Sequence, residues 1–107
     1  MYCADCTETT VAWVAQPHGI YLCEACACVH RALGPDVSRV KKYDTCRVDV
    51  DNQDAALRYR RKKGAPPRLD KNASERERFN QAKAIYKDKR WYEEAQVNKT
   101  TVVKEID

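Results

Sequence analysis

The chain has 107 residues, a formal net charge of +4 and 34% charged residues, and it contains six cysteines. This length suits one domain whose single hydrophobic core is adequate but not large. No apolar run approaches the length of a membrane span, which argues against an integral membrane protein, so we expect a soluble one.

Four of the cysteines follow the spacing Cys3-x2-Cys6-x16-Cys23-x2-Cys26. Each Cys-x-x-Cys turn can direct two sulfurs at one metal ion, and the loop between the turns brings the second pair to the same ion. Four thiolates make a complete tetrahedral ligand set for structural zinc. The spacing therefore predicts one structural Zn²⁺ ion bound by these four cysteines, and its binding free energy would contribute to folding.

A disulfide-rich secreted fold is the alternative, because six is an even number of cysteines. No apolar signal segment precedes Cys3, however, and the paired spacings match metal-binding turns better than a disulfide framework. We therefore favour zinc and an intracellular protein whose thiols stay reduced. We expect Cys28 and Cys46 to be buried spare thiols, with Cys28 close enough to Cys26 to compete as a ligand.

In chain order, the first elements are short. Residues 9–15 are mixed in character, with Trp13 as the only large side chain. Residues 17–19 are typical of a turn, and residues 20–22 of a brief strand that leads into the second pair of cysteines.

The next segment predicts an α-helix over residues 24–33. Gly34 and Pro35 would end it, because glycine accepts the backbone conformation that follows a helix and proline cannot continue one. His30 and Arg31 lie off the apolar face, so the helix would carry Arg31 outward from the metal. The apolar face has helical spacing and consists of Cys26, Val29 and Leu33.

The second half of the chain predicts two short strands and two helices. The strands are expected at residues 37–42 and 47–50. Asn52 can cap a helix that runs to about residue 63, and Ser74 with Glu77 forms a capping box for a helix that runs to about residue 90. The side chains expected to face the core from this last helix, or from just beyond it, are Phe79, Ala82, Tyr86, Trp91 and Tyr92.

Charge is distributed unevenly along the chain. Residues 1–38 hold one basic and four acidic side chains, a net charge of −3, and the remaining residues carry a net charge of +7. The densest basic run begins at Arg58 and ends at Lys63. It can be the solvated end of a helix, where cations also stabilise the helix dipole. The alternatives are contact with anionic membrane headgroups, a partner protein or nucleic acid.

The cysteine pattern, Trp13 and Arg31 together resemble the zinc-finger domain of Arf GTPase-activating proteins (ArfGAPs). The hallmark of that family, Cys-x2-Cys-x16-Cys-x2-Cys-x4-Arg, is matched at every position from Cys3 to Arg31. The similarity covers about residues 3–42 and returns more weakly over residues 66–91. Between these parts the chain lacks the longer segment of the family, with its Asp-x-Trp and Gly-Asn pairs, so it is identified as a divergent member.

The resemblance implies an α+β fold: a small zinc-finger domain with a treble-like four-cysteine zinc site and a short three-stranded sheet flanked by helices. We expect this domain at residues 1–92 and a polar, extended or mobile C-terminal tail at residues 93–107. The resemblance also implies a cytoplasmic protein at the Golgi or other endomembranes, and we expect a monomer.

The function implied by the resemblance is activation of GTP hydrolysis by an Arf-family small GTPase in its GTP-bound form. Arg31 would be the arginine finger, because a planar, permanently charged guanidinium can neutralise charge that develops on phosphate oxygens. The zinc would not touch the nucleotide but would anchor the helix that carries Arg31. Such a protein acts in trans on the GTPase rather than as an enzyme with its own substrate.

The residues expected to contact the partner are Trp13, His30, Arg39 and Lys41. Trp13 would pack beneath Arg31 or face the partner, although plain core packing is the usual fate of a tryptophan. His30 is expected near the metal ligands or at the surface. Taken alone, Arg31 could also be an exposed arginine bound to a nearby carboxylate.

Two other functions remain open. A non-catalytic adaptor built on the same zinc scaffold is suggested by the short middle segment. A nucleic-acid-binding zinc module is suggested by the basic run that begins at Arg58. We rank nucleic acid last, because the basic residues are interleaved with acidic ones and no aromatic-rich surface for base stacking is evident.

Overall fold

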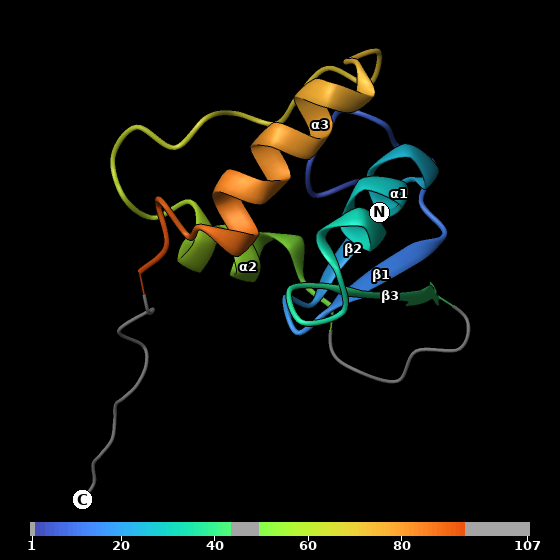
Figure 1. Ribbon diagram of the computed structural model, residues 1–107, viewed down its shortest axis with the longest axis horizontal. Helices are drawn as coiled ribbons and strands as arrows, with labels where there is room; N and C mark the ends of the chain where they lie inside the picture. Colours follow the sequence, from blue (N-terminus) through green and yellow to red (C-terminus); the bar gives the residue numbers. More distant parts are fainter. Residues whose placement is uncertain (1, 44–49, 94–107) are drawn as a thin grey trace, which may run out of the picture.

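A computed structural model describes residues 2–43 and 50–93 (Figure 1). Helix α1 lies against the sheet and also packs on α3, while α2 contacts strand β2. None of the helices in these ranges is long and apolar enough to cross a bilayer. The elements are β1 (Trp13–Gln16), β2 (Ile20–Leu22), α1 (Glu24–Leu33), β3 (Arg39–Lys42), α2 (Asn52–Tyr59), α3 (Glu75–Ala82) and the π-helical turn η2 (Lys83–Lys87).

The predicted α+β fold with a three-stranded sheet is confirmed, but one of its strands was not expected. The strand order is β2-β1-β3 with both pairs antiparallel, so β1 is the central strand. Val14 and Ala15 of β1 are both fully buried. A short strand covered on both faces shows no alternation of apolar and polar residues, and the sequence pattern therefore missed it. The strand expected at residues 47–50 lies outside the described residues except for Val50, which is in no strand.

The helix predicted at residues 24–33 is confirmed as α1. Gly34 ends it with φ 97°, a left-handed conformation that favours glycine, and its N–H donates to the carbonyl oxygen of Arg31 at 3.1 Å. Cys26 and Val29 on its apolar face are buried. The helix thus starts directly after Cys23 and stops two residues after Arg31.

Helix α2 differs from the prediction at both ends. Its cap is Asp51, whose Oδ1 accepts from the N–H groups of Gln53 at 3.0 Å and Asp54 at 3.1 Å. Asn52 instead accepts from the N–H of Tyr21 at 2.8 Å and ties α2 to β2. The helix ends at Tyr59 rather than near residue 63.

The capping box predicted before α3 is confirmed. Ser74 Oγ accepts from the N–H of Glu77 at 3.1 Å, and the Ser74 N–H donates to Glu77 Oε1 at 3.1 Å. The helical segment ends with η2 at Lys87 instead of residue 90, because the chain turns at Lys89, which has φ 51°.

The core contains a cluster of rings around His18, which is 2% exposed. Its ring centroid lies 4.6 Å from that of Tyr86 and 5.1 Å from that of Tyr59. His18 Nδ1 lies 2.9 Å from the Tyr59 hydroxyl oxygen. Burial, reinforced by the nearby His30, lowers the pKa of His18 to about 4. His18 is therefore neutral in the folded protein at neutral pH.

This pKa shift predicts acid sensitivity that the substitution His18→Gln reduces. An unfolded histidine titrates near pH 6.5, so the stabilisation is complete above about pH 6.5 and is lost as pH falls toward about 4. Between about pH 7 and about pH 5, the wild type should lose about 2 kcal/mol more unfolding free energy than the variant. Urea denaturation with excess zinc at both pH values measures this difference. Equal losses in the two proteins would contradict a neutral, buried His18.

Candidate functional site

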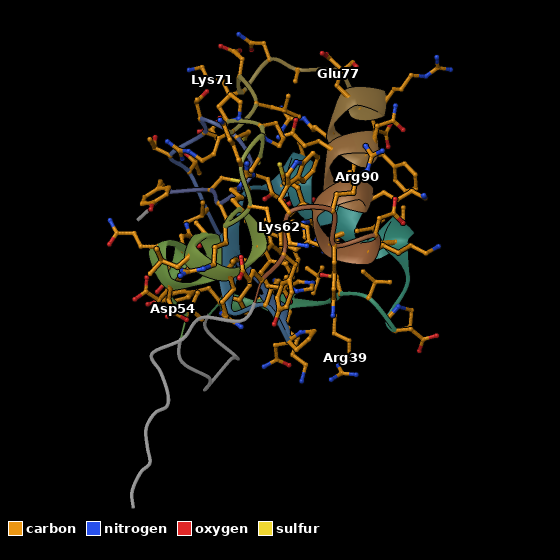
Figure 2. The ribbon with its side chains drawn as sticks, turned by 90° about the vertical axis from the view of Figure 1, so that its left-hand side faces the viewer. Arg39, Asp54, Lys62, Lys71, Glu77 and Arg90 are labelled. Carbon is orange, nitrogen blue, oxygen red and sulfur yellow. The ribbon has the colours of Figure 1, made fainter. Side chains whose placement is uncertain are left out.

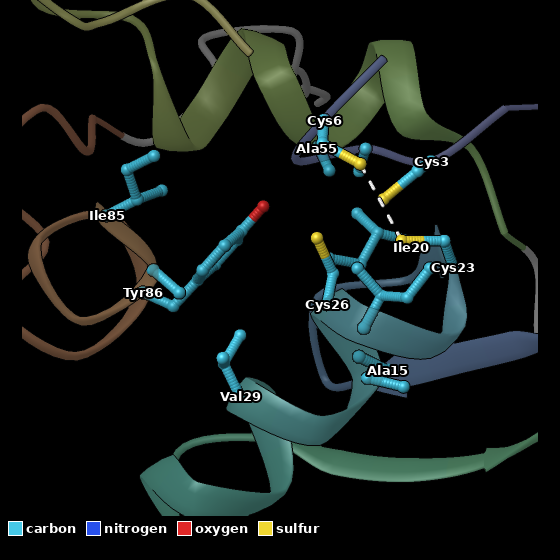
Figure 3. Packing of buried hydrophobic residues seen from close by; sticks show 14 of the residues in the cluster. Cys3, Cys6, Ala15, Ile20, Cys23, Cys26, Val29, Ala55, Ile85 and Tyr86 are labelled. Carbon is cyan, nitrogen blue, oxygen red and sulfur yellow. Dashed lines mark hydrogen bonds between the residues drawn. The ribbon is translucent and has the colours of Figure 1, made fainter. Parts of the chain in front are cut away.

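The sulfurs of the four knuckle cysteines converge in the interior (Figure 3). All four sulfurs lie within 4.8 Å of one another, and Cys6 Sγ is 3.6 Å from Cys23 Sγ. A tetrahedral zinc ion with Zn–S bonds of about 2.3 Å needs sulfurs about 3.8 Å apart. The cluster fits that ion, and a site closed by four thiolates leaves no open position for substrate. The members are Cys3, Cys6, Cys23 and Cys26.

Hydrogen bonding among the sulfurs also favours a bound cation. The bond with Cys23 is the main cause that raises the pKa of Cys3 to about 12, while the pKa of Cys23 is lowered. The thiols therefore cannot all ionise at neutral pH in the absence of a metal. A dication reverses this preference by deprotonating every ligand.

The described cysteines form no disulfide, which removes the secreted-scaffold alternative for them. Cys28 is free and exposed, so the expectation that it is a buried spare thiol is wrong. It also lies outside the cluster of four sulfurs. Cys46 falls outside the described residues.

Three N–H donors point at the sulfurs, and the strongest comes from Arg78, which the sequence analysis did not select. Arg78 Nη1 donates to Cys26 Sγ at 3.1 Å, and backbone N–H groups of Asp5 and Glu8 reach Cys3 Sγ and Cys6 Sγ at 3.4 Å each. Arg78 is only 6% exposed. Its guanidinium therefore offsets the net negative charge of four thiolates around a divalent ion.

Asp5, between the first two cysteines, ties the metal site to the rest of the fold. It is 6% exposed, and its carboxylate accepts from the Tyr86 hydroxyl at 2.6 Å and lies 2.7 Å from His30 Nε2. Arg60 Nη2 lies 3.7 Å away. Burial alone would raise the pKa of Asp5, but His30, Tyr86 and Arg60 outweigh it and keep that pKa below its ordinary value. The pattern offered no signal for this network, because its members are far apart in the chain.

The prediction that His30 contacts a partner is wrong. His30 is fully buried, with Nδ1 2.8 Å from Ser38 Oγ and Nε2 bound to Asp5. It cannot reach a surface without unfolding the last turn of α1. Its role in the structure is to fasten that turn to the metal-binding segment.

Arg31 follows His30 and points the other way, into solvent. Its guanidinium carbon lies 4.5 Å from the centroid of the Trp13 ring, and its Nη1 lies 3.9 Å from Cys28 Sγ. Among the residues that the structure describes, Arg31 forms no ion pair with a carboxylate. Stacking on a ring restricts the guanidinium while its N–H groups can still bind an incoming anion.

Trp13 is half-buried and lies beneath Arg31. Its Nε1 donates to Glu24 Oε1 at 2.9 Å. Glu24 opens α1 and Arg31 is near its end, so the indole spans the exposed side of the helix. Trp13 thus combines contact with the core with support of the arginine.

Arg39 and Lys41 are exposed on β3, but they lie on the opposite face of the sheet from Trp13. Lys42 pairs with Trp13 in the β1–β3 register, and alternate strand residues point to opposite faces. Lys42, which the sequence analysis did not select, therefore shares the face that carries Arg31. A hollow of about 340 Å³ beside it is lined by Val11, Ala12, Trp13, Lys42 and Tyr43.

The sulfur contact of Arg78 predicts that Arg78→Met weakens zinc binding by about 10- to 100-fold. Arg78→Lys should recover part of this loss, because it keeps a positive charge but not the planar fork. Competition with a chromophoric chelator gives both affinities. Arg76→Met, an exposed change two residues away, is the control. Equal affinities for Arg78→Met and the control would show that the contact does not stabilise the thiolates.

Sequence comparison places these features in a known family. Residues 1–95 match the ArfGap family, described as "Putative GTPase activating protein for Arf". The chain is 36% identical over 67 residues to stromal membrane-associated protein 1 of Mus musculus and of Homo sapiens, which is 54% of this chain and 15% and 14% of those proteins. It is 41% identical over 39 residues to the human ARF GTPase-activating protein GIT2, covering 36% of this chain and 5% of that protein. The chain therefore matches only a small part of the length of these relatives.

The fold matches a solved structure of the same kind. The solution structure of the ArfGap domain of human RIP aligns with a TM-score of 0.72 at 19% identity, covering 94% of this chain and 82% of that one. This similarity supports the fold, and the family match extends over most of the sequence. The chain therefore belongs to the ArfGap family.

Proposed function

We propose that this chain stimulates GTP hydrolysis by an Arf-family small GTPase in its GTP-bound form and that Arg31 is the arginine supplied in trans. The observation that carries this proposal is an exposed guanidinium, stacked on Trp13 at 4.5 Å, on a helix that begins at the cysteine cluster. Membership of the ArfGap family supports the class of partner.

The chemistry required of Arg31 is electrostatic. Negative charge spreads over the phosphate oxygens as the γ-phosphoryl group is transferred, and a fork of N–H donors can stabilise it. An arginine supplied in trans to a GTPase increases the rate by roughly 10³–10⁵. Because Trp13 already restricts Arg31, less side-chain freedom would be lost when the transition state forms.

The metal we propose is Zn²⁺, bound by Cys3, Cys6, Cys23 and Cys26. When bound, it supplies structural anchoring and stays buried with its four ligands. The chain's own contribution is the link from Asp5 through His30 to the last turn of α1, at 2.7 Å. This link holds the backbone at Arg31 in place relative to the metal-binding segment.

The proposal includes a monomer that acts in the cytoplasm at the Golgi or other endomembranes, with an anionic membrane surface as a second contact. The domain would span residues 1–92. A non-catalytic adaptor is the alternative that the departure from the family between residues 40 and 66 favours. In that case the partner would bind the same surface without acceleration of hydrolysis.

Arg31→Ala should lower the activated rate of GTP hydrolysis by about 10³-fold or more, because the transition-state contact is lost. Arg31→Lys should also fail, since an ammonium group cannot replace the planar fork. Single-turnover hydrolysis by Arf-class GTPases, with zinc-loaded protein added, measures both rates.

Arg76→Ala is a matched control on exposed helical surface and should retain the wild-type rate. Zinc content and thermal unfolding verify that all three variants fold. No acceleration by the wild type across a panel of Arf-class GTPases, together with binding that survives Arg31→Ala, would replace the proposal with the adaptor function.

Trp13→Ala should lower the same rate by about 2- to 5-fold, because an exposed cation–π contact contributes about 0.5–1 kcal/mol. Trp13→Phe keeps a ring beneath Arg31 and should lose less. Glu24→Gln, which keeps an acceptor for the indole N–H, serves as the control. A full rate with Trp13→Ala at saturating GTPase would show that stacking does not orient Arg31.

A further inference from the structure

Two basic segments that are distant in the chain lie side by side on the α2 side of the molecule. The Lys62 N–H donates to the carbonyl oxygen of Trp91 at 3.0 Å, and the Glu93 N–H donates to that of Arg58 at 2.8 Å. Figure 2 shows Lys62 and Arg90 on the face turned toward the viewer. We call the exposed cations of these segments the basic patch: Arg61, Lys62, Lys63, Lys89 and Arg90.

The carboxylates near the basic patch neutralise little of its charge. Glu93 lies 3.9 Å from Arg61, and Asp88 pairs at 3.2 Å with Lys83, which is outside the patch. In the described part of the chain, the other four patch cations form no ion pair. The patch therefore presents a concentrated positive charge to solvent.

Half-buried aromatic rings support these cations from below. Lys89 Nζ lies 5.1 Å from the Tyr92 ring centroid, and the Arg90 guanidinium carbon lies 5.8 Å from that of Trp91. Tyr92 in turn packs edge-on against the buried Tyr59, with ring centroids 4.9 Å apart. The rings are held within the fold, so they are not available to stack on nucleic-acid bases.

An exposed apolar side chain adjoins the basic patch in sequence. Leu57 is 57% exposed in the last turn of α2, four residues before Arg61. An apolar side chain near several cations suits the headgroup region of a bilayer, where apolar groups enter the acyl boundary and cations meet anionic lipid.

We propose that the basic patch docks this domain on an anionic lipid bilayer. Figure 1 shows α2 and the segment after η2 on one side of the molecule and α1 on the other. Docking through the basic patch therefore leaves the helix that carries Arg31 free. The proposal extends the run from Arg58 to Lys63 into a surface built from two segments. It does not depend on GTPase activation.

The test is cosedimentation of the zinc-loaded protein with vesicles of phosphatidylcholine and phosphatidylserine, compared with vesicles of phosphatidylcholine alone. Wild type should bind only the anionic vesicles, and binding should fall as salt is raised. Lys62→Glu combined with Arg90→Glu should weaken binding about tenfold or more. Arg39→Glu combined with Arg76→Glu makes the same change of net charge on β3 and α3 and should weaken it less than about threefold.

Three results would overturn the proposal: equal binding to both kinds of vesicle, equal losses in the two double variants, or tighter binding of a single-stranded RNA through the same residues. Hydrolysis by a GTPase without its lipid anchor, measured with no vesicles present, separates this proposal from the proposed function. There the Lys62→Glu, Arg90→Glu variant should match wild type. Absence of hydrolysis in that assay leaves the vesicle result unaffected.

Discussion

The convergence of four buried sulfurs from two distant turns is the constraint on which the rest of the structure depends. The second turn begins α1, and the first is held by the segment that follows α2. There Leu69 donates its N–H to the carbonyl oxygen of Asp5 at 2.9 Å, and Arg68 Nη1 reaches the carbonyl oxygen of Cys3 at 2.9 Å. Two strands, a helix and a later loop are thus fastened at one point. A domain of this size has a small core, and a metal at this point would supply much of its stability.

The same helix has a buried polar side and an exposed functional side at neighbouring residues. His30 is fully buried against Asp5 and Ser38, whereas Arg31 is exposed over Trp13. Removing one partner of a buried charged hydrogen bond is costly, so His30 fixes the helix backbone firmly. The side chain of Arg31 then needs only the ring of Trp13 to restrict it. Rigid backbone and accessible guanidinium are properties that electrostatic catalysis in trans requires.

The charge of the molecule separates along the fold as well as along the sequence. Residues 1–38 have a net charge of −3, yet α1 within them carries the proposed catalytic arginine. The basic patch forms on the other side, where the segment after α2 meets the segment after η2. A GTPase and an anionic surface could therefore be engaged by different faces without competition.

Local patterns in the sequence determined the ligand set, α1 and the capping box of α3, because each depends on residues a few positions apart. The spacing of the cysteines and the Gly34 stop are features of this kind. Only the tertiary structure decided that β1 is central, that His30 is buried, that Arg39 and Lys41 lie away from Arg31, and that Arg78 serves a sulfur. Each of these results from contacts between distant residues, such as Arg78 with Cys26 at 3.1 Å and Tyr86 with Asp5 at 2.6 Å. Hydrophobic periodicity reports which side of an element is apolar, but it does not report which polar partner waits on the buried side.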